Sequence, residues 1–272
     1  MQGPIGVFDS GYGGLTVLKS IRQVLPQYDY LYLGDNARTP YGTRSFETVY
    51  QYTLQAVTYL FEQGCPLVIL ACNTASAKAL RSIQQQDLPQ LAPEKRVLGV
   101  IRPTSERIGE ISISGKVGVL ATNGTVLSQS YVLEIAKFYP EVSVYQQACP
   151  LWVPLVENDE LSGVGSAYFV EKSVRQLMEQ SSDIDTILLG CTHYPLLIDL
   201  IRQYVNPSIK VVEQGPVVAK SLKDYLLRHP EIEIRCSRNG GVLYQTTDDP
   251  VKFNESSGIF LGSTVQSERI VL

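Results

Sequence analysis

Two of the five cysteines stand in matching contexts that could support acid–base chemistry. Cys72 follows the apolar run LVILA and precedes Asn-Thr, and Cys191 follows TILLG and precedes Thr-His. Each thiol therefore lies where a predicted strand passes into a helix, and the N-terminus of a helix favours a thiolate. A single free cysteine is most often a small buried hydrophobic residue. The duplicated context favours a functional pair over that structural alternative.

The other three cysteines, Cys65, Cys149 and Cys236, lack this context, and we expect them to be structural. The sequence contains no C-x-x-C motif, so neither a zinc ribbon nor a thioredoxin-like site is indicated. Cys191-x-His193 alone offers too few ligands for a metal ion. An odd number of widely spaced free thiols fits a reducing cytoplasm.

Proton transfer on both faces of one carbon atom would use both thiols. One would start as a thiolate and abstract a proton, the other would start as a thiol and deliver one, and the roles would reverse for the opposite enantiomer. A hydrolase with one cysteine nucleophile and His193 as its base is a second possibility. A binding module with inert thiols is a third.

Polar residues near the predicted strand ends extend this candidate site. Asp9 could accept a proton, hold an ammonium group or simply cap a turn. His193 could protonate and stabilise a neighbouring thiolate, or be a hydrogen-bonded structural residue. The glycine run at 11–14 is not a dinucleotide fingerprint, because Thr16 stands where the last glycine is required. Such a turn can bind a carboxylate through backbone N–H groups, or only reverse the chain.

Short apolar runs alternate with amphipathic stretches along the whole chain, and this pattern predicts parallel sheets with helices on both faces. The apolar spacing predicts helices over residues 15–25 and 49–59. The predicted strands are Ile5–Phe8, Tyr30–Leu33, Leu67–Ala71, Val97–Val100, Lys116–Leu120, Val142–Tyr145, Thr186–Leu189, Lys210–Val212, Val242–Tyr244 and Gly258–Leu261.

A weak internal repeat indicates two related α/β halves. IGVFDSG at 5–11 resembles VGVLATNG at 117–124, and LVILACNTA at 67–75 resembles TILLGCTHY at 186–194. Each half would then offer one cysteine at the carboxyl end of a strand, where ligands bind in open α/β sheets. We expect a first domain of residues 1–98 plus 213–272 and a second domain of residues 99–212.

The overall composition limits the partners. A net charge of −4 offers no gain from counterion release on phosphates, so nucleic acid is not an expected partner. The N-terminus lacks the basic and apolar regions of a signal peptide, and no apolar run approaches the roughly 20 residues that span a bilayer. We expect a cytoplasmic protein that acts on a small molecule, with no membrane partner.

Seven motifs occur together in a fixed order. They are DSGYGGLTV at 9–17, GD at 34–35 with PYG at 40–42, ACNTASA at 71–77, ATNGTV at 121–126, ACPLWVPLVE at 148–157, LGCTHYPLL at 189–197 and YQTTDDPVKF at 244–253. This set resembles the glutamate racemases of the aspartate/glutamate racemase family. The two cysteine motifs alone would indicate only the wider amino-acid racemase group, which includes aspartate and hydantoin racemases. The PYG motif after GD favours glutamate.

The resemblance implies two pseudo-symmetric, doubly wound α/β domains with mainly parallel sheets and the active site in the cleft between them. It implies that no pyridoxal phosphate and no metal ion is needed. Cys72 and Cys191 would be the acid–base catalysts, assisted by Asp9 and His193, with Glu157 as a third assisting residue. The product D-glutamate would serve peptidoglycan synthesis, and hence cell shape, in a bacterial cytoplasm. A homodimer is expected from the family.

The resemblance also assigns the substrate contacts. Ser10 and the Tyr41–Gly42 backbone would hold the side-chain carboxylate, and the α-ammonium group would lie near Asp9. The residues expected at the substrate are Asp9, Ser10, Tyr41, Gly42, Asn73, Thr74, Thr192 and His193, of which Asn73, Thr74 and Thr192 would hold the α-carboxylate.

One feature departs from the family pattern, and one feature of some members is missing. The sequence reads Glu213-Gln214-Gly215 where Asp and then Ser are expected, which would alter a contact in the cleft but nothing catalytic. The short N-terminus also lacks the extension through which some members are activated by a cell-wall precursor, so we do not expect that regulation.

Overall fold

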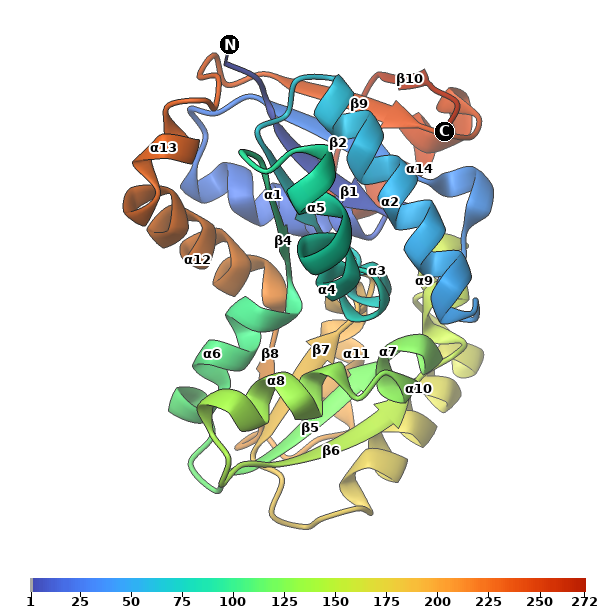
Figure 1. Cartoon of the computed structure of the whole chain (residues 1–272). Helices are drawn as coiled ribbons and strands as arrows, with labels where there is room; N and C mark the ends of the chain where they lie inside the picture. The colour runs from blue at the N-terminus through green and yellow to red at the C-terminus, as the bar shows by residue number, and fades with distance from the viewer. Residues whose placement is uncertain (1) are drawn as a thin grey trace.

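The computed structural model describes residues 2–272, which form two separate sheets with every strand pair parallel (Figure 1). The six-stranded sheet has the order β10-β9-β2-β1-β3-β4 and the four-stranded sheet the order β6-β5-β7-β8. The strands are β1 (Ile5–Asp9), β2 (Tyr30–Gly34), β3 (Leu67–Leu70), β4 (Arg96–Gly99), β5 (Lys116–Ala121), β6 (Ser143–Ala148), β7 (Thr186–Gly190), β8 (Lys210–Val212), β9 (Val242–Thr246) and β10 (Ser267–Arg269).

Fourteen α-helices connect these strands within the described residues 2–272. They are α1 (Gly14–Val24), α2 (Phe46–Glu62), α3 (Asn73–Lys78), α4 (Leu80–Ser82), α5 (Leu88–Leu91), α6 (Ile101–Ile111), α7 (Asn123–Leu127), α8 (Ser130–Phe138), α9 (Trp152–Glu157), α10 (Val164–Met178), α11 (Ile198–Gln203), α12 (Gln214–Arg228), α13 (Pro230–Glu233) and α14 (Pro250–Leu261). Short 3₁₀ turns lie at Asn36–Arg38 and Tyr194–Leu197, and a π-helical turn lies at Ile83–Asp87. No described helix is long and apolar enough to cross a membrane.

The sheet topology confirms the internal repeat. In chain order, the four strands β1 to β4 lie as second-first-third-fourth, and β5 to β8 lie in the same arrangement. Strand β1 corresponds to β5 and β3 to β7, which are the two pairs that the sequence similarity selected. Strands β9 and β10 return to the first sheet. The domain boundaries themselves stay a prediction.

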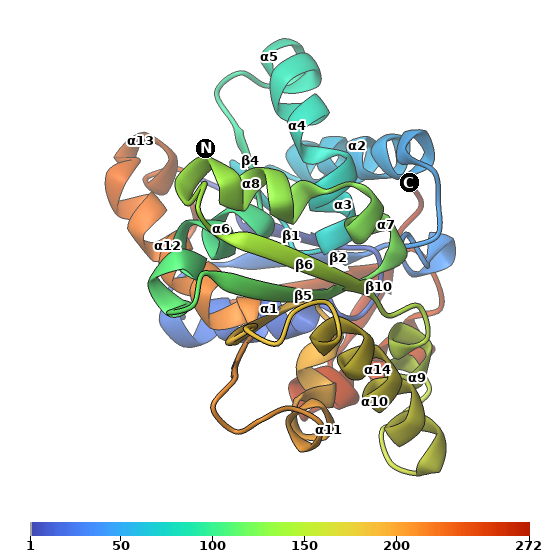
Figure 2. The same ribbon diagram turned by 90° about the horizontal axis from the view of Figure 1, so that it is seen from below.

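Alternate residues of the central strands pack into different cores. Val7 and Tyr32 belong to one hydrophobic cluster, to which α1 and α12 contribute, whereas Phe8 and Leu33 belong to another, to which α2 contributes. The second sheet has α6 and α8 on one face and α10 and α11 on the other (Figure 2). Because both faces are covered, the two central strands of this sheet, β5 and β7, are almost continuous apolar runs in the sequence.

The chain crosses between the sheets twice. Helix α6 leads from β4 in the first sheet to β5 in the second, and α12 leads back from β8 to pack against α1 (Figure 1). Gly215 allows this packing, because a Cβ atom there would lie 2.4 Å from Ser20 Oγ. Helices α6 and α12 also contact each other, so the two crossing segments run close together at the junction of the sheets.

The predicted strand at Gly258–Leu261 is wrong, because this segment is the last turn of α14. Asp249 caps the helix by accepting a hydrogen bond from the Val251 N–H, and Pro250 occupies its first turn. Phe253, Ser257 and Phe260 are buried at helical spacing. The sheet edge is instead β10, whose polar residues at 267–269 gave no strand signal.

Candidate active site

Cys72 lies at the N-terminus of α3, directly beyond the end of β3. Its Sγ accepts a hydrogen bond from the Ala75 N–H at 3.4 Å, and Ser10 Oγ, just after β1, lies 3.4 Å from the same sulfur atom. Burial raises the pKa of Cys72 to about 12, the Asp9 carboxylate adds to the rise, and the two hydrogen bonds oppose it. Cys72 is therefore a neutral thiol at physiological pH.

Cys191 lies directly beyond the end of β7 in the second sheet. Its Sγ is 3.8 Å from His193 Nδ1, and His193 Nε2 is 2.9 Å from Glu157 Oε1 at the end of α9. Burial lowers the pKa of His193, but the hydrogen bonds and charges of Cys191 and Glu157 outweigh it and raise the pKa to about 10. His193 is therefore an imidazolium ion at neutral pH, next to Cys191.

Asp9 ends β1 and is buried among these groups. Its Oδ2 accepts a hydrogen bond from the Gly11 N–H at 3.0 Å, while Oδ1 has no hydrogen-bond partner among residues 2–272. Burial raises the pKa of Asp9, and the positive charge of His193 and the nearby Gly14 and Gly11 N–H groups oppose this rise. A buried carboxylate oxygen without a donor is a suitable partner for an ammonium group.

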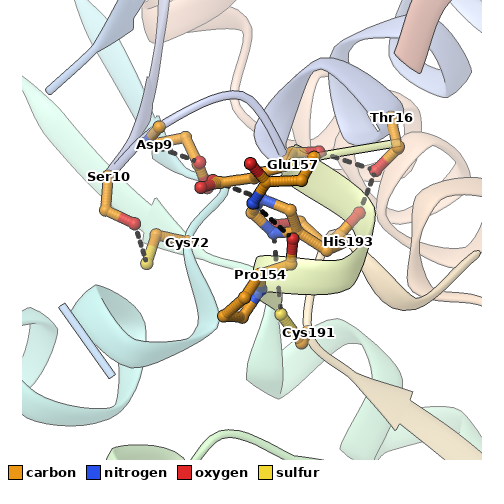
Figure 3. A network of polar contacts seen from close by, with 12 residues as sticks. Asp9, Ser10, Thr16, Cys72, Pro154, Glu157, Cys191 and His193 are labelled. Carbon is orange, nitrogen blue, oxygen red and sulfur yellow. Dashed lines mark hydrogen bonds and ion pairs between the residues drawn. The ribbon is translucent and has the colours of Figure 1, made fainter. Parts of the chain in front are cut away.

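The two thiols enter one polar cluster from two different sheets. Figure 3 shows Cys72 with Ser10 on one side of the cluster and Cys191 with His193 and Glu157 on the other. Each of these two cysteines is 6% exposed. The remaining cysteines, Cys65, Cys149 and Cys236, are at most 1% exposed. Of the five cysteines, the matched pair is therefore the most accessible to a small molecule.

The predicted substrate residues surround this cluster in different ways. The Tyr41 hydroxyl donates to Asp35, so only its backbone can face a ligand, and the Gly42 carbonyl accepts a hydrogen bond from the Gly124 N–H at 2.9 Å. Thr74 Oγ1 lies 3.1 Å from Thr122 Oγ1, across the junction of the two sheets. These contacts join the expected carboxylate-binding segments of the first sheet to the second sheet.

Thr192, the last predicted contact, is held by a residue that sequence reasoning missed. Thr16 Oγ1, in α1, donates to the Thr192 carbonyl at 2.9 Å. In the sequence, Thr16 is informative only because it excludes a dinucleotide-binding motif. Its role depends on the approach of α1 to the second sheet, for which no local pattern gives a signal.

The glycine run at 11–14 allows this approach. Gly13 has φ −56° and ψ −36°, a conformation open to any residue, so its small size is what matters. A Cβ atom on Gly13 would lie 2.2 Å from Thr192 Oγ1 and 2.4 Å from His193 Nδ1. The run therefore brings the first sheet against the Cys191–His193 turn.

Gly13→Ala is expected to lower kcat roughly tenfold or more, because the added methyl group must displace His193 from Cys191. Steady-state kinetics on the purified variant measure this loss. Gly165→Ala is the matched control, since a Cβ atom at that helical glycine meets nothing within 4 Å. Full activity in Gly13→Ala would show that the close contact is not needed.

Asn73 and Gln214 are arranged differently from the expectation. The Asn73 side chain is engaged with protein partners, because its Nδ2 donates to Gln214 Oε1 at 2.7 Å and its Oδ1 accepts from the Tyr131 hydroxyl at 2.6 Å. A contact of Asn73 with a substrate would therefore use its backbone N–H. In the sequence, Gln214 stands out only as a departure from the family pattern, and no motif points to Tyr131.

The site lies where two parallel sheets meet, and it combines two thiols, two carboxylates and an imidazole. These groups define an α/β protein that is equipped for proton transfer. No group of three or more His, Cys, Asp or Glu side chains within residues 2–272 is arranged to hold a metal ion.

Comparison with known proteins identifies the family. A family model described as Asp/Glu/Hydantoin racemase matches residues 5–222. A glutamate racemase from Geobacter metallireducens is 40% identical over 259 residues, which cover 95% of this chain and 92% of that protein. The chain belongs to the Asp/Glu/Hydantoin racemase family and is therefore an isomerase.

Solved structures agree with this assignment. A glutamate racemase isoform from Bacillus anthracis superposes with a TM-score of 0.90 at 30% identity, covering 99% of this chain and 98% of that one. A glutamate racemase from Francisella tularensis, solved in complex with D-glutamate, superposes with a TM-score of 0.86 at 32% identity, covering 99% and 97%. The α/β fold with two all-parallel sheets is thus shared over the full chain.

Proposed function

We propose that the protein is a glutamate racemase that interconverts L- and D-glutamate with Cys72 and Cys191 as its two acid–base groups. One observation carries the proposal: two nearly buried thiols, at corresponding strand ends of two repeated sheets, enter one polar cluster. The names of the full-length relatives, and the bound D-glutamate in one of their structures, support glutamate as the substrate.

The surroundings of the two thiols differ. His193 carries a positive charge 3.8 Å from Cys191 Sγ, a position suited to stabilise negative charge that develops on this sulfur atom, whereas burial and Asp9 raise the pKa of Cys72. The Cys191 thiolate takes the Cα proton from one face, and the electron pair of the broken C–H bond stays on the carbon. Cys72 then delivers its S–H proton to the opposite face. For the other enantiomer the roles reverse, so that Cys72 is the thiolate that takes the proton and Cys191 the thiol that delivers one.

Contacts around the thiols orient the substrate in this proposal. The free Oδ1 of Asp9 receives the α-ammonium group. Ser10 and the Tyr41–Gly42 backbone bind the side-chain carboxylate. The backbone of Asn73, with Thr74 and Thr192, binds the α-carboxylate. Binding by N–H and hydroxyl groups leaves His193 free to act on Cys191 rather than to neutralise the substrate.

The biological setting is part of the same proposal. D-Glutamate made by this reaction would enter peptidoglycan, in a bacterial cytoplasm where five free thiols stay reduced. We propose that the enzyme works as a homodimer, without pyridoxal phosphate or metal, and that the two sheets belong to separate domains of residues 1–98 plus 213–272 and 99–212.

A circular-dichroism assay with pure L-glutamate, in buffer containing a metal chelator and no added cofactor, tests this function. The ellipticity should decay to zero as the racemic mixture forms. L-Aspartate, offered in parallel, should keep its ellipticity. Decay with aspartate alone would make the protein an aspartate racemase, and decay with neither would favour a binding module on the same fold.

A further inference from the structure

Asn73, Gln214 and Tyr131 form a closed ring of hydrogen bonds next to the segments that carry the two cysteines. Asn73 Nδ2 donates to Gln214 Oε1 at 2.7 Å, Gln214 Nε2 donates to the Tyr131 hydroxyl at 2.7 Å, and that hydroxyl donates to Asn73 Oδ1 at 2.6 Å. All three side chains are at most 3% exposed. Each member donates once and accepts once within the ring, and such chains of bonds strengthen one another in a low-dielectric interior.

The members of the ring come from the parts of the fold that carry the two thiols. Asn73 directly follows Cys72 and begins α3. Tyr131, in α8, packs against the end of β7, since a Cβ atom on Gly190 would lie 3.1 Å from Tyr131 Cε2, and Cys191 is the next residue. The ring therefore connects Asn73, which follows Cys72, to Tyr131, which packs against the residue before Cys191.

Gln214 occupies the junction between the two sheets. It is the first residue of α12, which leads the chain back to the first sheet, and its Nε2 also lies 3.1 Å from the Val100 carbonyl oxygen and 3.3 Å from Thr104 Oγ1. Val100 immediately precedes α6, which leads the chain to the second sheet. One side chain thus joins both crossing segments to the ring. The shorter serine expected from the family could not make this set of contacts.

We propose that the ring of Asn73, Gln214 and Tyr131 fixes the distance and orientation between Cys72 and Cys191, with Gln214 as a positioning residue that acts across the junction of the sheets. This inference rests on the racemase function proposed above. It predicts that weakening the ring impairs proton delivery from the second thiol more than substrate binding or the first proton abstraction. The reason is that abstraction needs one thiol in place, whereas inversion needs both.

Two reactions separate these steps. Racemisation requires abstraction by one thiol and delivery by the other. Elimination from 3-chloroglutamate requires only abstraction: a thiolate takes the Cα proton, the electron pair forms the C=C bond, and chloride leaves. The resulting enamine tautomerises to an imine, and water converts it to 2-oxoglutarate and ammonium, both of which can be quantified. The ratio of the two rates is independent of how much protein is folded.

The experiment compares wild type with Gln214→Met, Tyr131→Phe and the double variant. Gln214→Met keeps the chain length without polar atoms, and Tyr131→Phe removes one oxygen atom. We expect each to lower kcat for glutamate racemisation roughly 10- to 100-fold, with KM changed less than about threefold and elimination largely retained. The double variant should lose no more than the larger single loss, because the ring acts as a unit.

Tyr30→Phe is the matched control. Its hydroxyl is also buried and donates one hydrogen bond, to the Leu25 carbonyl at 2.7 Å, but at the opposite end of β2 from the site. It should leave the ratio of racemisation to elimination unchanged. An unchanged ratio in Gln214→Met and Tyr131→Phe, with racemisation intact in wild type, overturns the inference alone. Absence of glutamate racemisation in wild type overturns the proposed function, and this inference with it.

Discussion

Cys72→Ala and Cys191→Ala are each expected to reduce glutamate racemisation by about 10⁴-fold, the upper range for loss of a general acid or base. Each thiol serves one face of Cα, so neither can replace the other. Polarimetry or circular dichroism on both enantiomers measures the loss. Elimination from 3-chloroglutamate should survive selectively, with each variant retaining the reaction of the enantiomer whose Cα proton faces the remaining thiol.

Cys236→Ala is the matched control for this pair. Cys236 is fully buried, and its thiol donates to the Ile232 carbonyl, away from the polar cluster. The control should racemise glutamate at the wild-type rate. Racemisation within tenfold of wild type by either Cys72→Ala or Cys191→Ala would exclude the two-base assignment, and survival of Cys191→Ala alone would favour a reaction centred on Cys72.

His193→Gln should lower kcat by about 10²–10³-fold, the usual loss when a preorganised charge beside the reacting groups is removed. The imidazolium lies 3.8 Å from Cys191, and glutamine supplies no charge there. Because the two enantiomers have equal free energy, kcat/KM must fall equally in both directions. The asymmetry should appear in elimination instead, which should slow only for the chloroglutamate enantiomer that Cys191 attacks.

The pH dependence follows from the same pair. In wild type the His193 pKa is raised to about 10, so the imidazolium persists at lower pH and activity falls as pH rises through that region. Glu157→Gln removes the negative charge that favours the imidazolium and leaves only a neutral amide oxygen as acceptor, so the pKa of His193 falls toward its usual value. The alkaline limb of the kcat profile should therefore move to lower pH.

His229→Gln is the control for both histidine experiments. The chain has only two histidines, and His229 is paired with Glu231 on the surface at 3.2 Å. Its substitution should change neither kcat nor the position of the alkaline limb. An alkaline limb that stays in place in Glu157→Gln would mean that ionisation of His193 does not control the activity.

The sequence alone was sufficient to assign to the site those residues that directly follow a buried strand. Asp9, Cys72 and Cys191 each follow an apolar run, and the ends of parallel strands meet at one edge of a sheet. The similarity of the two cysteine segments likewise predicted two related α/β halves, and the strand order repeats in the two sheets. These inferences succeeded because burial of a parallel strand leaves a strong local pattern.

Contacts between distant segments could not be predicted in this way. The steric need for Gly13 is set by Thr192 and His193, far along the chain, and the ring role of Gln214 depends on Tyr131 in helix α8, which covers the second sheet. The error at Gly258–Leu261 has a local cause: a glycine followed by apolar residues resembles a buried strand, and the Asp249 cap that begins the helix lies nine residues earlier. Expected contacts of Asn73 came from the family and did not anticipate Gln214.

Solvent-deuterium incorporation at Cα tests the two-base account most directly. L- and D-glutamate are offered separately in D₂O, without cofactor, and both enantiomers are isolated early in the reaction. The account predicts deuterium almost entirely in the newly formed enantiomer, because its proton comes from a thiol that has exchanged with solvent, while the recovered substrate keeps its original hydrogen. Equal labelling of substrate and product would indicate one shared base and would contradict the assignment of Cys72 and Cys191.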